Sequence, residues 1–185
     1  MAWIRVVGEE EAGEELRIAL EAVRGKRGKL SNIMAVHSLR PDAMTAHVDL
    51  YMAAMFGASG LTREERETIA LVVSGANHCP YCIQHHAEAL KHYWRDEERI
   101  ARLIDDHRSA DVSPKMLAIL DYAVELTERP YAVEEADAER LRREGLSDED
   151  VLTVNLIVSY FNFVNRIALG LGVECREDEV AGYKY

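Results

Sequence analysis

Cysteine is scarce in this sequence, and so are the features that mark several large classes of protein. Three cysteines in 185 residues are too few for the disulfide framework of a small secreted domain. No apolar run approaches the roughly 20 residues that a membrane-spanning helix needs. The N-terminal region turns acidic at residues 9–11, unlike a secretory signal. We therefore expect a cytoplasmic protein without a membrane-spanning segment, whose thiols are kept reduced.

Basic charge is also in short supply. The chain carries 22 lysine and arginine residues against 33 acidic residues, which gives a formal charge of −11 at pH 7. The largest basic group, at residues 24–29, is interrupted by glycines and is typical of a solvated loop. This charge balance disfavours nucleic acid and anionic membrane surfaces as partners.

Helical signals run through nearly the whole sequence, and few windows show the alternation of a strand. No low-complexity linker or domain boundary interrupts them. The sequence therefore predicts one all-α domain over residues 1–185, an orthogonal bundle with its motif region at 62–93 and C-terminal helices at 114–172. The expected helices are 9–23 (ended by Gly25 and Gly28), one opened by Pro41 and broken by Gly57, 62–77, 80–93, one beginning near Asp96, one capped by Ser113, 134–144 and 147–169.

Two neighbouring helices carry the most specific pattern. The first opens with a capping box at 62–65, and the uncharged run at 68–77 predicts that it continues into the protein interior. Pro80 suits the first position of the next helix. Cys79 then takes the N-cap position and Cys82 lies in the first turn.

The two cysteines stand three residues apart and can form a disulfide and release it again. Free N–H groups and the positive end of the helix dipole surround both sulfurs, which lowers a thiol pKa. His86 follows Cys82 by one helical turn and shares its face. Cys82 is therefore expected to lose its proton to His86 more readily than Cys79.

Glu67 approaches His86 if the two helices form an antiparallel hairpin around residue 78. In such a hairpin Glu67 faces residues 88–89, which lie within one helical turn of His86. The carboxylate would then orient the imidazole. Burial is expected to raise the pKa of Glu67 towards values useful for a proton shuttle. Together with the cysteine pair, this couple predicts thiol redox chemistry supported by a proton relay.

Several other side chains lie near this motif or share its chemistry. Tyr81 and His78 are candidate secondary site residues. His85 falls on the helix face opposite Cys82 and is expected to be structural or solvent-facing. Cys175 lies in an acidic tail and is interpreted as an idle thiol. A polar cluster on the last helix is expected to be structural, although it could also line the pocket: Asn162, Asn165 and Arg166.

The pattern Glu-x11-Cys-x-x-Cys-x-x-x-His resembles the alkylhydroperoxidase D (AhpD) family within the carboxymuconolactone decarboxylase superfamily. The residues that match it are Glu67, Cys79, Cys82 and His86. Segments 69–82 and 159–172 resemble the peroxidase-related branch, and the likeness covers most of residues 30–173.

The resemblance implies an AhpD-like fold, a homo-oligomer (dimer, trimer or hexamer) and reduction of hydroperoxides in antioxidant defence. By carry-over, Cys82 would be the attacking thiolate, Cys79 would close a redox-active disulfide, and His86 with Glu67 would form the proton relay. The cycle would use an external dithiol, either a reductant protein or a small thiol, and no bound cofactor or metal. Tyr81 stands where the AhpD prototype carries a second relay histidine, and a phenol of pKa about 10 shuttles protons poorly near neutrality.

Other interpretations stay open. Cys79, Cys82 and His86 could bind zinc, with Glu67 or a water as the fourth ligand, although no second pair completes a structural site. The chain could also be a non-catalytic assembly protein with vestigial thiols. Cys-Pro-Tyr-Cys is the active-site tetrapeptide of glutaredoxins as well, but that fold needs strands that this sequence does not predict.

Overall fold

The computed structural model describes residues 2–175 and residue 179. Within them it has α-helices, short 3-10 turns and no strand, so the all-α prediction is confirmed. The helices are α1 (Glu14–Arg27), α2 (Asn32–Ala35), α3 (Pro41–Phe56), α4 (Arg63–Ala76), α5 (Pro80–Trp94), α6 (Glu97–Asp105), α7 (Pro114–Glu128), α8 (Glu135–Arg143) and α9 (Asp148–Gly170). The 3-10 turns are Glu9–Glu11, Val36–Leu39, His107–Ser109 and Pro130–Ala132.

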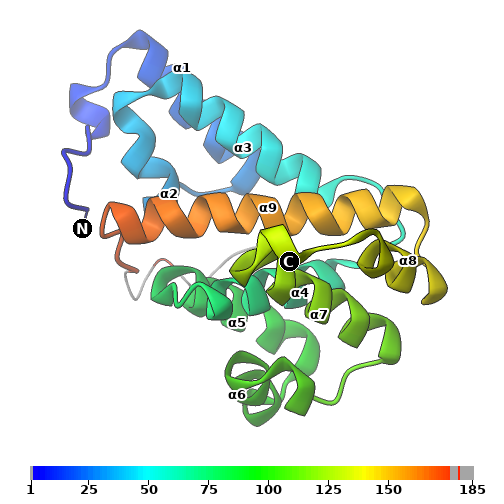
Figure 1. The fold of residues 1–185 in the computed structure, drawn as a ribbon. Helices are drawn as coiled ribbons and strands as arrows, with labels where there is room; N and C mark the ends of the chain where they lie inside the picture. Colours follow the sequence, from blue (N-terminus) through cyan, green and yellow to red (C-terminus); the bar gives the residue numbers. More distant parts are fainter. Residues whose placement is uncertain (1, 176–178, 180–185) are drawn as a thin grey trace.

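Helix α9 runs through the middle of the bundle (Figure 1). Helix α3, backed by α1, packs on one side of it, and α4 and α7 pack on the other side. Helix α5 lies antiparallel to α4 and makes its largest contact with that helix. The motif region is thereby held where α4, α5 and α9 meet.

The apolar composition of α9 has a structural reason. By length and composition alone this helix could cross a membrane, which the sequence reading did not anticipate. Its buried face supplies a central part of the core, including Val154, Ile157 and Val158, none of which is exposed. Contact with α3, α4 and α7 therefore accounts for this hydrophobic stripe.

The first predicted helix is placed differently in the structure. Glu9–Glu11 form a separate 3-10 turn, and α1 begins at Glu14 and continues through Gly25 to Arg27. The buried stripe of α1 outweighs the small helix penalty of Gly25. Gly28 ends the helix instead, because its φ of 79° is a left-handed conformation that glycine adopts without strain.

The predicted capping box of α4 is present, with reciprocal hydrogen bonds between Thr62 and Glu65. The helix then becomes buried, as expected, from Arg66 to Ser74. The guanidinium of Arg66 donates hydrogen bonds to the carbonyl oxygens of Ala54, Gly57 and Leu61. These bonds tie the α3–α4 loop to the base of the helix that carries Glu67.

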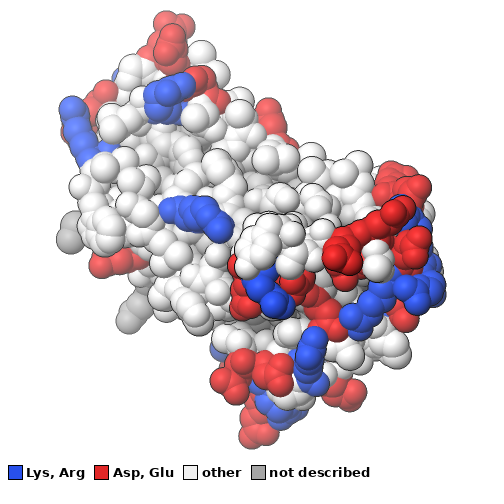
Figure 2. Space-filling model, viewed as in Figure 1, with Lys and Arg blue, Asp and Glu red and all other residues white. Residues whose placement is uncertain are grey.

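Charged side chains are unevenly distributed over the surface (Figure 2). In the view of Figure 1 they gather towards the ends of the molecule, whereas the middle, over α9, is largely uncharged. Exposed apolar residues of α9 are Leu152, Leu156, Phe163 and Leu169.

Candidate functional site

The α4–α5 hairpin brings Glu67 to His86, as the sequence predicted. A tight turn joins the helices, and its residue His78 has a left-handed backbone with φ of 51°. His86 Nδ1–H donates a hydrogen bond to Glu67 Oε2 over 2.6 Å. The spacing alone located this carboxylate–imidazole pair, because the hairpin leaves the two chains little freedom of register.

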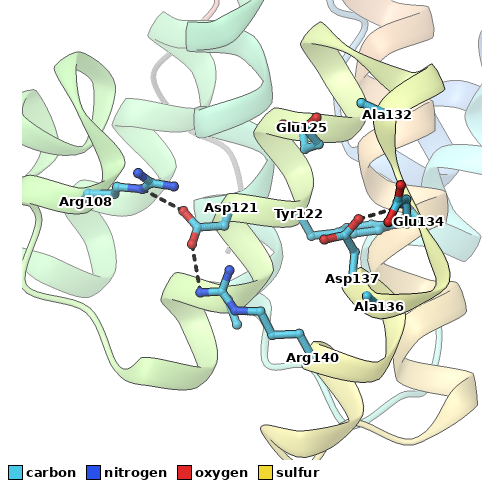
Figure 3. Close-up of a pocket in the computed structure, with 10 residues that line it drawn as sticks. Arg108, Asp121, Tyr122, Glu125, Ala132, Glu134, Ala136, Asp137 and Arg140 are labelled. Carbon is cyan, nitrogen blue, oxygen red and sulfur yellow. Dashed lines mark hydrogen bonds and ion pairs between the residues drawn. The ribbon is translucent and has the colours of Figure 1, made fainter.

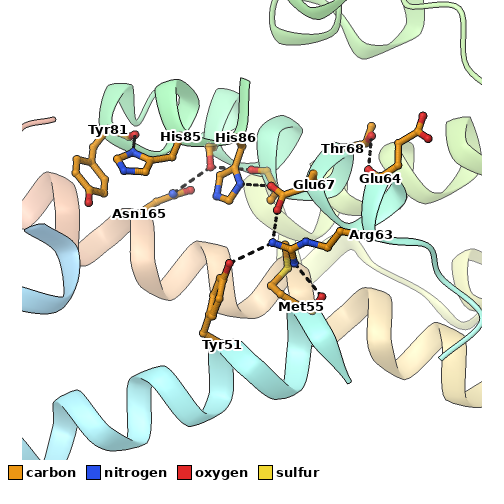
Figure 4. Close-up of polar contacts among 12 residues, drawn as sticks. Tyr51, Met55, Arg63, Glu64, Glu67, Thr68, Tyr81, His85, His86 and Asn165 are labelled. Atoms are coloured by element: carbon orange, nitrogen blue, oxygen red, sulfur yellow. Dashed lines mark hydrogen bonds and ion pairs between the residues drawn. The ribbon is translucent and has the colours of Figure 1, made fainter. Parts of the chain in front are cut away.

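Glu67 has a second partner that the sequence analysis missed. Its other oxygen, Oε1, lies 2.5 Å from a guanidinium nitrogen of Arg63, and only 2 % of the Glu67 side chain is exposed. Figure 4 shows the carboxylate between the imidazole on one side and the guanidinium on the other. The i, i+4 spacing of Arg63 and Glu67 was an available signal.

The pKa of Glu67 is lowered, contrary to the sequence-based expectation that it would be raised. Burial is the largest influence and does raise the pKa, but the charges and hydrogen bonds of His86 and Arg63 outweigh it. The pKa of His86 is lowered because burial outweighs the stabilising effect of Glu67. Near neutrality the pair is therefore a carboxylate and a neutral imidazole, whose Nε2 is free to accept a proton.

Two cavities meet at the cysteine motif. One has a volume of about 60 Å³ and is lined by Cys82, His86, Phe161 and other mostly apolar residues. The second has a volume of about 580 Å³, and Cys79 and Cys175 line it. Tyr81 lines both cavities and forms part of the wall between them. Cys82 and Cys79 therefore line different cavities, although neither residue is more than 2 % exposed.

The two thiols also differ in acidity. The Cys82 side chain, with help from the backbone N–H groups of Cys82 and Tyr81, lowers the pKa of Cys79 to about 7 against the effect of burial. Interaction with Cys79, followed by burial, raises the pKa of Cys82 well above its usual range. When the pair loses a proton, the negative charge is therefore expected on Cys79. This order reverses the expectation that Cys82 would ionise first, because the Cys82 thiol and two backbone N–H groups stabilise the Cys79 thiolate, while the same interaction and burial oppose ionisation of Cys82.

This acidity predicts early alkylation of Cys79. With dilute iodoacetamide, the rate at Cys79 should reach half its maximum near pH 7, because the thiolate forms above that pKa. Tandem mass spectrometry of the shared peptide separates Cys79 from Cys82. In a Cys82→Ala variant the midpoint should move to higher pH, because the main cause of the lowered pKa is gone. An unchanged midpoint in that variant would show that Cys82 does not control the acidity of Cys79.

Asn165 also belongs to the site. Its side chain is completely buried, and an interaction with it partly offsets the rise in the pKa of Cys82. Asn165 accepts a hydrogen bond from Asn77 over 3.0 Å and donates one to Ser74 over 3.3 Å. These hydrogen bonds give Asn165 the structural role that the sequence predicted. Its side chain also interacts with Cys82.

The other side chains near the motif differ in burial and in the cavities that they line. Tyr81 is buried, whereas His78 is exposed at the turn and lines neither cavity. His85 was expected to face away from Cys82, but it lines the smaller cavity and packs on the Tyr81 ring with centroids 4.4 Å apart. Cys175 is not isolated, because its sulfur lies 3.9 Å from His85 Nδ1. Sequence separation hid this proximity, since only the fold returns the tail to α5.

A further cavity, of about 280 Å³, lies between α7 and α8 (Figure 3). Asp121 forms ion pairs with both Arg108 and Arg140 over 2.9 Å. None of the four motif residues lines this cavity.

The zinc interpretation of the motif finds no support in the ligand geometry. Among the described residues, Cys79, Cys82, His86 and Glu67 do not form a compact group of metal-ligating atoms. The nitrogen Nδ1 of His86 is already committed to Glu67. A different group of potential metal ligands lies at His85, Cys175 and Glu179.

Comparison with known proteins places this geometry in context. Residues 41–125, which include the four motif residues, match the sequence profile of the carboxymuconolactone decarboxylase family. The uncharacterized protein YdfG of Bacillus subtilis (strain 168) is 26% identical over 143 residues, which cover 77% of this chain and 96% of YdfG.

Two crystal structures are similar over almost the whole chain. One is the alkylhydroperoxidase AhpD core of a peroxidase-related protein from Ralstonia eutropha JMP134, with 29% identity and a TM-score of 0.85 over 97% of this chain and 94% of that one. The other is a peroxidase-related protein from Silicibacter sp. TM1040, with 27% identity and a TM-score of 0.86 over the same shares of the two chains.

Proposed function

Because the chain belongs to the carboxymuconolactone decarboxylase superfamily and has the AhpD-like fold of its peroxidase-related proteins, we propose that it is a thiol-dependent hydroperoxidase. The observation that carries the proposal is the buried His86–Glu67 hydrogen bond, which prepares a neutral imidazole in the cavity lined by Cys82. A coupled second thiol at Cys79 completes the requirements of a disulfide cycle.

The smaller cavity suits a hydroperoxide group. Its volume of about 60 Å³ is well above the roughly 10–15 Å³ that a single water needs, so a hydroperoxide group can enter it. The aromatic ring of Phe161 packs on His86 with centroids 4.5 Å apart and shields the imidazole. Hydrogen peroxide, or the reactive end of an organic hydroperoxide, fits such a space.

In the first step the sulfur of Cys82 attacks the terminal peroxide oxygen while His86 Nε2 takes the thiol proton. The O–O bond breaks, Cys82 becomes a sulfenic acid, and the leaving alkoxide receives the proton from His86 to give an alcohol, or water from hydrogen peroxide. Glu67 stabilises the imidazolium that exists between the two proton transfers. The high pKa of Cys82 makes this base necessary.

In the second step the Cys79 thiolate attacks the Cys82 sulfur. Hydroxide leaves and is protonated to water, and the Cys79–Cys82 disulfide forms. A resolving cysteine with a pKa of about 7 has a substantial thiolate fraction near neutrality, so closure can precede overoxidation.

An external dithiol then reduces the disulfide by two successive thiol exchanges. The larger cavity beside Cys79 provides the approach for its first thiol, and Cys82 leaves as the thiolate and recovers a proton through His86. The cycle requires no bound cofactor. The cytoplasmic location stays a prediction, as does the homo-oligomer, for which the uncharged face over α9 is the surface that we favour.

The wild-type protein provides the test. Reduced protein mixed with one equivalent of tert-butyl hydroperoxide should lose two thiols per chain and gain a Cys79–Cys82 disulfide, identified by peptide mass spectrometry. Dithiothreitol or dihydrolipoamide should then support repeated turnover. If excess hydroperoxide leaves all thiols intact, the peroxidase proposal is wrong and a non-catalytic assembly protein becomes the better interpretation.

A further inference from the structure

Three ligand-bearing side chains that the proposed cycle does not use meet beside the start of α5. His85 comes from α5, and Cys175 and Glu179 come from the tail beyond α9. They offer one imidazole nitrogen, one sulfur and one carboxylate oxygen, and these atoms lie within 4.8 Å of one another.

The imidazole of His85 is oriented as a metal ligand would be. Its Nδ1–H donates a hydrogen bond to the Tyr81 carbonyl oxygen over 2.9 Å, as Figure 4 shows. This bond fixes the tautomer, so Nε2 is the ring nitrogen that carries no proton and has the properties of a metal ligand. Nε2 lies 3.6 Å from Glu179 Oε1.

Glu179 provides an independent indication. Only 7 % of the residue is exposed. Its Oε1 accepts hydrogen bonds from the Asn32 N–H, over 2.7 Å, and from the Tyr81 hydroxyl. The other oxygen, Oε2, is buried and has no hydrogen-bond partner among the described residues. Burial of an unpaired carboxylate oxygen is unfavourable, and a cation bound beside it would remove that penalty.

We propose that His85, Cys175 and Glu179 form a binding site for a divalent transition-metal ion, with Zn²⁺ as the best match. Imidazole, thiolate and carboxylate are the three ligand types that zinc takes in proteins. Zinc bonds of about 2.0–2.3 Å in a tetrahedron place the ligand atoms roughly 3.3–3.8 Å apart. The 3.6 Å between His85 Nε2 and Glu179 Oε1 already meets this requirement, and the ligand atoms of the three residues lie within 4.8 Å of one another, so small side-chain shifts would bring the sulfur into range.

Such a site would fasten the tail to α5 next to the redox motif. Cys175 and Cys79 line the same cavity, so the metal would lie at the wall through which we expect the dithiol to approach. Three protein ligands leave a fourth position for water or an incoming thiol. The site is separate from the Cys79–Cys82 pair and does not depend on peroxidase activity.

The test uses the full-length chain in a Cys79→Ser/Cys82→Ser background, so that Cys175 is the one remaining thiol. Co²⁺ is the spectroscopic probe, because thiolate ligation gives a charge-transfer band in the near ultraviolet. We expect one Co²⁺ per chain with this band, and displacement of Co²⁺ by one equivalent of Zn²⁺. Cys175→Ser should remove the band, and Glu179→Gln should weaken Zn²⁺ binding by at least about 100-fold.

His92→Gln serves as the matched control, because His92 is an exposed histidine on the same helix and is outside the cluster. This variant should bind Co²⁺ as its parent does. Weak binding without the charge-transfer band, or equal affinity in the Glu179→Gln variant, would overturn the proposal. Because the readout is metal binding, its failure would leave the proposed peroxidase cycle untouched.

Discussion

Replacement of Cys82 by serine is expected to abolish hydroperoxide turnover, with kcat falling by at least about 10³-fold. A hydroxyl in this position is a far weaker nucleophile, and among the described residues that line the cavity of His86, Cys82 carries the one thiol. Peroxide consumption with excess dithiothreitol, followed by stopped flow, measures the loss.

Cys79→Ser is the matched variant, and its outcome is different. It should consume one equivalent of hydroperoxide per chain and then stop, with Cys82 trapped as sulfenic acid or oxidised further to sulfinic acid. If the results are exchanged, so that Cys82→Ser consumes one equivalent and Cys79→Ser none, then Cys79 is the attacking sulfur. Its lower pKa makes this a real competitor, because the thiolate is the reactive form.

Glu67→Gln is expected to lower kcat/KM by about 100-fold or more, within the usual range for loss of acid–base assistance. An amide can still accept the proton of His86 Nδ1, but it carries no charge to stabilise the imidazolium. Because the Glu67 charge raises the pKa of His86 relative to burial alone, its removal should lower that pKa further. The acid limb of the kcat/KM profile should accordingly shift to lower pH, which a purely structural defect would not cause.

Two controls separate the relay from folding. The Glu67→Gln substitution removes the ion pair of Arg63 and leaves its charge uncompensated. The double variant Arg63→Met/Glu67→Gln removes that charge as well, so it should recover thermal stability without recovering activity. Glu88→Gln removes a half-exposed carboxylate on α5 and should leave the rate unchanged. Full activity in the Glu67→Gln variant would remove Glu67 from the mechanism.

The local structure was predictable where short-range chemistry decides it. Thr62 with Glu65, and Ser113 before Pro114, mark helix starts that the structure confirms. The pairing of Glu67 with His86 also followed from the sequence, because a tight hairpin fixes which residues face each other. The four-residue motif could be located in this way, although its chemistry stays a proposal.

The rest of the site depends on contacts that sequence spacing does not contain. Asn165 reaches Cys82 from α9, and Glu179 reaches His85 from the tail. The acidity of the thiols was assigned to the wrong sulfur because helical spacing describes the distance to His86 but not the enclosure of each thiol. The pKa of Glu67 was misjudged for the same reason, since the effect of burial was considered without the neighbouring Arg63.

The position of Tyr81 in the lining of both cavities has a consequence for the order of events. The hydroperoxide and the dithiol would reach the cysteine pair through separate cavities. The alcohol product could then remain bound in one cavity while the dithiol binds in the other. Release of the product would not have to precede binding of the reductant.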